Sequence, residues 1–187
     1  MRRLVMFNFM TLNGFIEGAK GDISWNKNSD PEKDAYAMEG IGAGGTLLFG
    51  RITYEMMASY WPTPVALEQN HAMAEGMNRA DKVVFSKTLT KADWSNTRLI
   101  RGDLIQEVKN MKQSSGSSMC VLGSGSIVTQ LAERGLIDTY QFMIDPVAIG
   151  DGTPAFKGLK RPLNLKLISS RVFKSGVVVL NYEPAGA

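Results

Sequence analysis

Apolar stretches of strand length recur along the chain and alternate with segments of mixed polarity. These stretches cover residues 3–10, 46–49, 82–85, 119–122 and 140–144. Short, continuous apolar runs of this kind are typical of strands that are buried on both faces of a sheet. Near the end of the chain, residues 163–173 and 177–182 are joined by Lys174-Ser175-Gly176, which predicts a closing antiparallel hairpin.

Helices are predicted in most of the intervals between these stretches. They cover residues 31–39, 66–78 and 126–134, and two further helices begin near Gly50 and at Asp103. Asp30 followed by Pro31 is a typical helix start, because the carboxylate can cap the helix and the missing N–H of proline is not needed there. Asp103 can cap in the same way, with Gln106 completing a capping box. Residues 11–27 are expected to form a loop.

Strands that alternate with helices and then end in a hairpin indicate an α/β fold. We expect three layers, with a mostly parallel central sheet that is covered by helices on both faces and closed by a C-terminal antiparallel hairpin. The length of 187 residues suits one domain over residues 1–187. Ligands of such sheets bind beyond the carboxyl ends of the strands, where loops pass into helices.

Composition removes several function classes. One cysteine excludes an internal disulfide, and one histidine excludes a histidine-based metal centre, so no metal site is expected. The formal charge of +3 comes from scattered basic residues, without the stripe typical of nucleic-acid binders. No apolar run approaches the length that spans a bilayer, and the first residues lack a signal-peptide cleavage site, so we expect a cytoplasmic protein.

Three strand-to-helix junctions have the composition of an anion site. Gly50, Arg51 and Thr53 lie at a helix start, where free backbone N–H groups, a hydroxyl and a guanidinium can hold phosphate. The second junction, residues 122–126, contains Gly123, Gly125 and Ser126 in a Gly-Ser-Gly-Ser sequence, and the third contains Ser86 and Lys87. Each junction alone could equally be an ordinary tight turn. The three together favour a nucleotide ligand.

Nucleophilic catalysis is not favoured by this sequence. A serine nucleophile would need a base, and His71, the one histidine, falls on a predicted helix. Cys120 lies in the middle of a predicted buried strand, where a thiol is typically inert.

The motifs, taken in order, resemble those of the dihydrofolate-reductase-like superfamily, and in particular the branch that contains the C-terminal reductase domain of bacterial riboflavin biosynthesis (RibD). They are Thr11-Leu12-Asn13-Gly14-Phe15-Ile16, Asp22-Ile23-Ser24-Trp25, Gly50-Arg51-Ile52-Thr53-Tyr54-Glu55, Val84-Phe85-Ser86-Lys87-Thr88, Gly123-Ser124-Gly125-Ser126 and the loop that begins at Gly150. The resemblance extends over nearly the whole chain, and it implies a dihydrofolate-reductase-like fold with NADPH as the hydride donor.

The resemblance also implies roles for particular residues. Gly50, Arg51, Thr53, Gly123, Gly125 and Ser126 would hold the cofactor phosphates, with Ser86 and Lys87 near the adenosine 2′-phosphate. Asn13, Gly14 and Trp25 would border the nicotinamide and the substrate. The loop that begins at Gly150 would close the pocket or a subunit contact, and a homodimer is expected.

Two positions depart from the riboflavin-type pattern. Asn13 stands where members commonly carry Asp, and Phe15 where a Lys often follows. Because an amide cannot exchange a proton as a carboxylate does, Asn13 cannot be the acid. Asp30 or Asp34 could stand in for the acidic residue of dihydrofolate reductase, and Asp30 is at the same time the expected helix cap.

Two hypotheses follow for the function. The first is an NADPH-dependent reductase of a small heterocycle, either pterin-like or a riboflavin-pathway aminopyrimidine such as the substrate of 5-amino-6-(5-phosphoribosylamino)uracil reductase. The second is a nucleotide-binding protein that has the same fold but lacks reductase activity.

Overall fold

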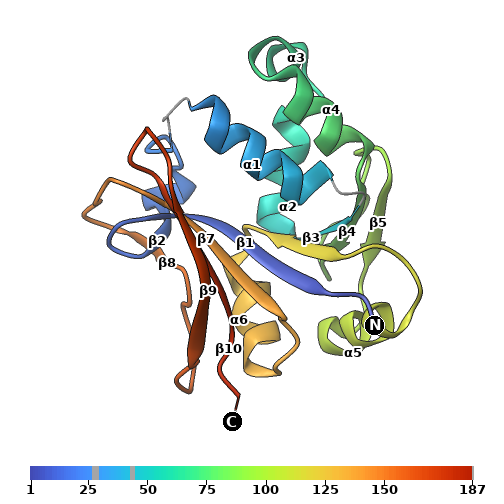
Figure 1. Ribbon diagram of the computed structural model, residues 1–187. Helices are drawn as coiled ribbons and strands as arrows, with labels where there is room; N and C mark the ends of the chain where they lie inside the picture. The colour runs from blue at the N-terminus through green and yellow to red at the C-terminus, as the bar shows by residue number, and fades with distance from the viewer. Residues whose placement is uncertain (27–29, 43–44, 187) are drawn as a thin grey trace.

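The structure, a computed structural model, describes residues 1–26, 30–42 and 45–186, and these residues form an eight-stranded central sheet (Figure 1). Its strand order is β5-β4-β3-β6-β1-β7-β10-β9. The strands are β1 (Leu4–Thr11), β3 (Thr46–Gly50), β4 (Asp81–Phe85), β5 (Thr97–Ile100), β6 (Met119–Leu122), β7 (Thr139–Asp145), β9 (Leu165–Val172) and β10 (Val178–Pro184). The six strands from β5 to β7 are parallel, and β10 runs antiparallel to both of its neighbours. This confirms the mostly parallel sheet and the closing hairpin.

Helices cover both faces of the sheet, as the alternating pattern predicts. One face carries α5 (Leu104–Gln113) and α6 (Gly125–Glu133), whose apolar side chains join one core cluster. The other face carries α1 (Pro31–Gly42), α2 (Arg51–Tyr60) and α4 (His71–Arg79), which contribute to a second cluster, and α3 (Pro64–Gln69) packs on α4. The three layers are visible in Figure 1. Burial of apolar surface on both sides explains why β6 is buried at every residue.

The segment over residues 11–27, expected to be a loop, contains regular structure. It forms β2 (Phe15–Gly18) and the short 3-10 helix η1 (Ala19–Gly21), and β2 pairs with β8 (Gly152–Pro154) as a second, two-stranded sheet. A Cβ atom at Gly152 would lie 2.1 Å from the Glu17 carbonyl oxygen, so this pairing requires glycine. The partner strand lies more than 130 residues away in the sequence, and a local pattern does not show it.

Two other elements differ from the prediction, namely one additional strand and one helix that is divided in two. Strand β5 was not expected, because its four residues include exposed Arg98 and are held by pairing with β4. The expected helix over residues 66–78 is two helices, since Asn70 leaves the helical conformation and its side chain accepts a hydrogen bond from the Met73 N–H at 3.1 Å. Helical spacing of apolar residues continues across this break, which is why periodicity does not reveal it.

The expected helix caps form, with one change. Asp103 accepts a hydrogen bond from the Gln106 N–H at 2.8 Å, but the Gln106 side chain donates to Asn110 instead of completing the capping box. Helix α1 begins at Pro31 after the Asp30 cap and continues to Gly42, beyond the expected end at residue 39. Within the described residues, no helix is both long and apolar enough to cross a membrane.

Candidate functional site

Two of the predicted junctions form one hydrogen-bonded unit at the carboxyl end of the sheet. The Gly50 N–H donates to the Ser124 hydroxyl at 3.0 Å, and the Ser124 N–H donates to the Thr53 hydroxyl at 3.1 Å. Strands β3 and β6 are neighbours in the sheet, so the loops that follow them meet. The starts of α2 and α6 therefore lie together and are held in a fixed relation.

The glycines of this unit are required by close packing. Gly123 has a φ of +63°, and a Cβ atom there would lie 3.1 Å from the Thr53 side chain. A Cβ atom at Gly125 would lie 2.8 Å from the Ile16 side chain. A side chain at Gly123 would press on Thr53 at the start of α2, and one at Gly125 would press on Ile16 of β2, which explains the glycines without reference to any ligand.

Both helix starts line a cavity of about 540 Å³, here called the helix-start cavity. It is lined by Ile16, Glu17, Gly50, Arg51, Ile52, Thr53, Phe85, Ser86, Ser124, Gly125, Ser126, Ile127, Gln130, Thr153 and Lys157. Neither helix start has a side-chain cap among the residues that the structure describes. Because no described side chain caps them, backbone N–H groups at both helix starts are available to an anion. The positive end of each helix dipole lies at the same place and also favours an anion.

Two cationic side chains, Arg51 and Lys157, line the helix-start cavity. Arg51 is half-exposed and forms an ion pair with Glu55, with 2.8 Å between nitrogen and oxygen, which leaves other donors of its guanidinium to face a ligand. Lys157 enters from the segment after β8. Lys87 is exposed and lies outside the described lining, whereas Ser86 lines the cavity and accepts hydrogen bonds from the N–H groups of Thr88 and Leu89.

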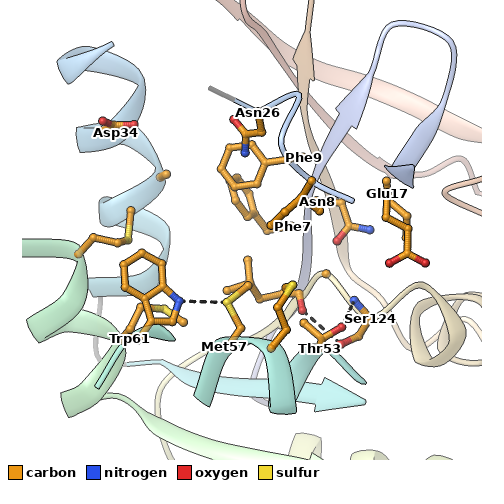
Figure 2. Close-up of a pocket in the computed structure, with 18 of the residues that line it drawn as sticks. Phe7, Asn8, Phe9, Glu17, Asn26, Asp34, Thr53, Met57, Trp61 and Ser124 are labelled. Atoms are coloured by element: carbon orange, nitrogen blue, oxygen red, sulfur yellow. Dashed lines mark hydrogen bonds between the residues drawn. The ribbon is translucent and has the colours of Figure 1, made fainter. Parts of the chain in front are cut away.

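A second cavity, of about 290 Å³ and here called the inner cavity, adjoins the first (Figure 2). Its lining includes the aromatic residues Phe7, Phe9, Trp25 and Trp61 and the polar residues Asn8, Asn26, Asp34 and Asn70. Ile16, Glu17, Thr53 and Ser124 line both cavities, so one ligand could extend from one to the other. Figure 2 shows the Trp61 indole N–H bonded to the Met57 sulfur, at 3.0 Å, which fixes one wall.

Several buried polar atoms of the inner cavity have no hydrogen-bond partner within the described part of the chain. They are both side-chain polar atoms of Asn8, the indole nitrogen of Trp25 and the side-chain oxygen of Asn26. An unpaired buried polar group costs roughly 1–3 kcal/mol of stability. A group of such atoms around one cavity is the arrangement expected of a site that completes its hydrogen bonds with a ligand.

The two candidate acidic residues have different surroundings. Asp34 lines the inner cavity, and the Lys33 ammonium lies 3.7 Å from its carboxylate. Asp30 is buried, and its carboxylate accepts bonds from the Glu32, Lys33 and Ser175 N–H groups at 3.0, 3.3 and 3.1 Å. Hydrogen bonding from Ser175, with the N–H groups of Lys33 and Glu32, lowers the pKa of Asp30. The expected cap at Asp30 is confirmed.

Asn13 and Gly14, expected beside the nicotinamide and substrate, lie in the turn between β1 and β2. The Asn13 amide donates to the Ile149 carbonyl at 2.7 Å and its oxygen accepts from the Ile149 N–H at 3.2 Å. Gly14 has a φ of +89°, which this turn requires. Asn13 thus fastens the turn to the loop before β8, a pairing that an aspartate could not make because it lacks the donor.

The lining residues that were not predicted from the sequence include Asn8, Glu17, Asn26, Trp61 and Lys157. A usable signal existed only at Asn8, which interrupts the apolar run of β1. Cys120 is buried as expected, and burial raises the pKa of its thiol to about 12. His71 is exposed and pairs with Glu75 on α4 at 3.2 Å.

The mostly parallel sheet with its terminal hairpin is the fold of dihydrofolate reductase. The structure matches dihydrofolate reductase from Enterococcus faecalis complexed with NADP(H) and RAB-propyl, with a TM-score of 0.65 and 16% identity over 98% of this chain and 97% of that one. It also matches a diaminohydroxyphosphoribosylaminopyrimidine deaminase/5-amino-6-(5-phosphoribosylamino)uracil reductase from Thermotoga maritima, with a TM-score of 0.69 and 15% identity over 98% of this chain and 57% of that longer one. At these identities the likeness establishes the fold.

The sequence places the chain within one family of this fold. Residues 2–179 match the model of the RibD C-terminal domain, so the chain belongs to that family. It is 30% identical over 182 residues to the uncharacterized protein YyaP of Bacillus subtilis (strain 168), covering 97% of this chain and 95% of that protein. The expected family and fold are confirmed.

Proposed function

We propose that this protein is an NADPH-dependent reductase of a small heterocyclic substrate, either pterin-like or an aminopyrimidine. The observation that carries the proposal is the meeting of the helix-start cavity and the inner cavity at the carboxyl end of the sheet. One cavity suits phosphates and the other suits flat rings with polar edges. Membership of the RibD C-terminal domain family and the NADP(H) bound to the Enterococcus faecalis enzyme support the same function.

The helix-start cavity fits the phosphates of a dinucleotide. In the proposal, the N–H groups at the starts of α2 and α6, together with Arg51 and Lys157, bind the diphosphate. Thr53 accepts the Ser124 N–H, so its own O–H is free to donate to a phosphate oxygen. Ser86 and Lys87 would meet the 2′-phosphate, which requires the exposed Lys87 side chain to turn toward the cavity.

In the inner cavity this chain would position the reactants and exclude water. When bound, NADPH supplies the hydride from its nicotinamide ring. Trp25, Trp61 and Phe9 would cover the substrate ring and remove water from it. Asp34 would hold a proton on its carboxyl group for delivery to the reduced ring, directly or through one water. Asp30 would act through α1, by holding the start of the helix that carries Asp34.

A second candidate function is nucleotide binding without reduction. The specific observation in its favour is Asn13, whose amide is used for the contact with Ile149 and cannot exchange a proton. The single unpaired cysteine suits the reducing cytoplasm under either function.

Calorimetric titration with NADPH and NADP⁺, followed by a turnover assay, tests both functions. We expect binding of NADPH in the micromolar range and loss of NADPH absorbance with at least one substrate from a panel of pterins and aminopyrimidines. Binding without turnover on the whole panel would favour the second candidate. If neither nucleotide binds at millimolar concentration, both functions are wrong.

A further inference from the structure

Asn8 is a polar residue at a position that the fold makes apolar. Side chains two residues apart on a strand share a face, and Leu4 and Met6, which precede Asn8 on its face of β1, are fully buried in the core. Asn8 is only 1% exposed, yet neither its amide nitrogen nor its amide oxygen has a hydrogen-bond partner among the described residues. A leucine or methionine would fill this position without leaving a buried polar group unpaired.

Asn8 lines the inner cavity at the end where it adjoins the helix-start cavity. In Figure 2 it lies across β1 from Phe7 and Phe9 and points toward Glu17 and Ser124, the residues through which the inner cavity adjoins the helix-start cavity. The hydroxyl of Ser124 is already engaged with the Gly50 N–H, and the Ser124 N–H with Thr53. Ser124 is therefore held by Gly50 and Thr53, while the Asn8 amide has no partner among the described residues and is left to a ligand.

A carboxamide offers one donor and one acceptor side by side. Its complement is another amide edge, in which a C=O and an N–H stand next to each other, so that two parallel hydrogen bonds form. Sites built to pair such groups reject analogues that lack them, because the buried amide of the protein then stays unsatisfied.

We propose that Asn8 is a specificity-determining residue that pairs with the amide edge of the bound ligand. Two molecules of the proposed reaction carry that chemistry: the nicotinamide carboxamide of the cofactor and the lactam of a pterin or pyrimidine ring. The inference deepens the proposed function and rests on it. Asn8 is not a proton donor in this proposal, and its role is to orient the ring that reacts.

Two substitutions and one control test the role of Asn8. Asn8→Leu keeps the size and removes both hydrogen-bonding groups, whereas Asn8→Asp keeps an acceptor and removes the donor. Met6→Leu is the control, because Met6 shares the same strand and face but does not line the cavity. The probes are NADPH, 2′-phosphoadenosine diphosphoribose (which lacks the nicotinamide) and 5-aminouracil with NADP⁺ present. Binding is followed by calorimetry and by the intrinsic fluorescence of the three tryptophans, of which Trp25 and Trp61 line the inner cavity.

The pattern of affinities decides between the two amide edges. If Asn8 pairs with the nicotinamide, both variants bind NADPH at least tenfold more weakly and bind the truncated nucleotide normally. If Asn8 pairs with the substrate ring, both nucleotides bind normally and 5-aminouracil binds at least tenfold more weakly. Unchanged binding of every probe, or an equal loss for the truncated nucleotide, overturns the proposal.

Thermal unfolding of the ligand-free protein gives a readout that does not depend on binding. Since Asn8 is unpaired, we expect Asn8→Leu to melt at or above the wild-type temperature, whereas an asparagine with a structural role would make this variant melt lower. A wild-type protein that binds no NADPH would overturn the proposed function, and the titration with 5-aminouracil would still test Asn8.

Discussion

At the scale of single residues, the same side-chain type has different consequences in different surroundings. The Asn13 side-chain nitrogen and oxygen both form hydrogen bonds with the backbone of Ile149. The corresponding atoms of Asn8 form none within the described chain. Asp30 is held by three N–H groups, whereas Asp34 lines a cavity. The carboxylate with the most hydrogen bonds is thus the structural one, and the candidate for chemistry is the one that a ligand can reach.

The Asp30 cap predicts a particular acid sensitivity. Its folded pKa lies below the ordinary value of 3.8, so its contribution to stability is present above that value and is lost as the pH falls through the lowered folded pKa. We expect the urea midpoint of the wild-type protein to fall as the pH drops below about 4, and to fall less steeply for Asp30→Asn. Parallel pH profiles of the two proteins would contradict this assignment.

Comparing Asp30→Asn with Asp34→Asn distinguishes a carboxylate that caps α1 from one that donates a proton to the substrate. Asparagine still accepts the helix N–H bonds, so Asp30→Asn should retain turnover within a few-fold. Asp34→Asn should reduce kcat by about 10²-fold or more, the usual contribution of a positioned acid, with NADPH affinity unchanged. A large loss of kcat in Asp30→Asn instead would assign the acid to Asp30.

At the scale of elements, close contact between loops decides where the site forms. Helices α2 and α6 start together because Gly50, Thr53 and Ser124 are hydrogen-bonded to one another. The small sheet of β2 and β8 lines the helix-start cavity through Glu17 and Thr153. Both arrangements include a close-packed glycine, Gly123 against the Thr53 side chain and Gly152 against the Glu17 backbone.

Substitution of Arg51 tests whether the start of α2 binds the phosphates of NADPH. We expect Arg51→Ala to weaken NADPH binding by roughly tenfold to a hundredfold, the value of about 1.5–3 kcal/mol for a hydrogen bond to a charged group. The fold should be unchanged, since Arg51 is exposed and, within the described part of the chain, its ion pair is with Glu55 on the same helix. Arg98→Ala, an exposed arginine on β5, is the control. An unaltered dissociation constant would refute the role.

Gly152 tests the pairing of β2 with β8. Gly152→Ala would place a Cβ atom 2.1 Å from the Glu17 carbonyl oxygen, and we expect it to destabilise the protein by about 1–3 kcal/mol. Gly150→Ala is the matched control two residues away, because a Cβ atom there meets nothing within 4 Å. Urea unfolding measures both, and equal stabilities would show that this contact relaxes without cost.

At the scale of the whole molecule, the last strand presents an exposed edge. β9 ends the sheet, and its apolar residues Leu167, Ile168 and Val172 are at least half-exposed. Long exposed edge strands with apolar side chains tend to pair with another chain. We propose that the homodimer expected from the family resemblance uses this strand.

Sedimentation of the wild-type protein and a charged variant tests the dimer. We expect a dimer at tens of micromolar and a shift toward monomer for Leu167→Glu, since a carboxylate in an apolar contact must lose its hydration. Val65→Glu places the same charge on a similarly exposed apolar residue of α3 and should leave the dimer intact. A wild-type monomer, or dimers in both variants, would exclude this use of β9.

The sequence by itself determined the class of fold and the strand-to-helix junctions that line the two cavities. Buried parallel strands such as β6 are apolar throughout, and caps such as Asp30 and Asp103 act within one turn, so both signals are local. The strand-to-helix junctions at Gly50 and Gly123 were predictable for the same reason. The break at Asn70 escaped prediction because apolar spacing continues across it.

Only the tertiary structure decided which of these pieces meet. The β2–β8 pairing, the hydrogen bond between Ser124 and Thr53 and the contact of Asn13 with Ile149 join residues that are far apart in the chain. Only the tertiary structure shows that the Asn8 amide is unpaired. The sequence shows an asparagine in a strand, and the positions of all its neighbours are needed to show that none of the described residues bonds it. Long-range contacts carry no local sequence pattern, and they are what turned three candidate junctions into two adjoining cavities.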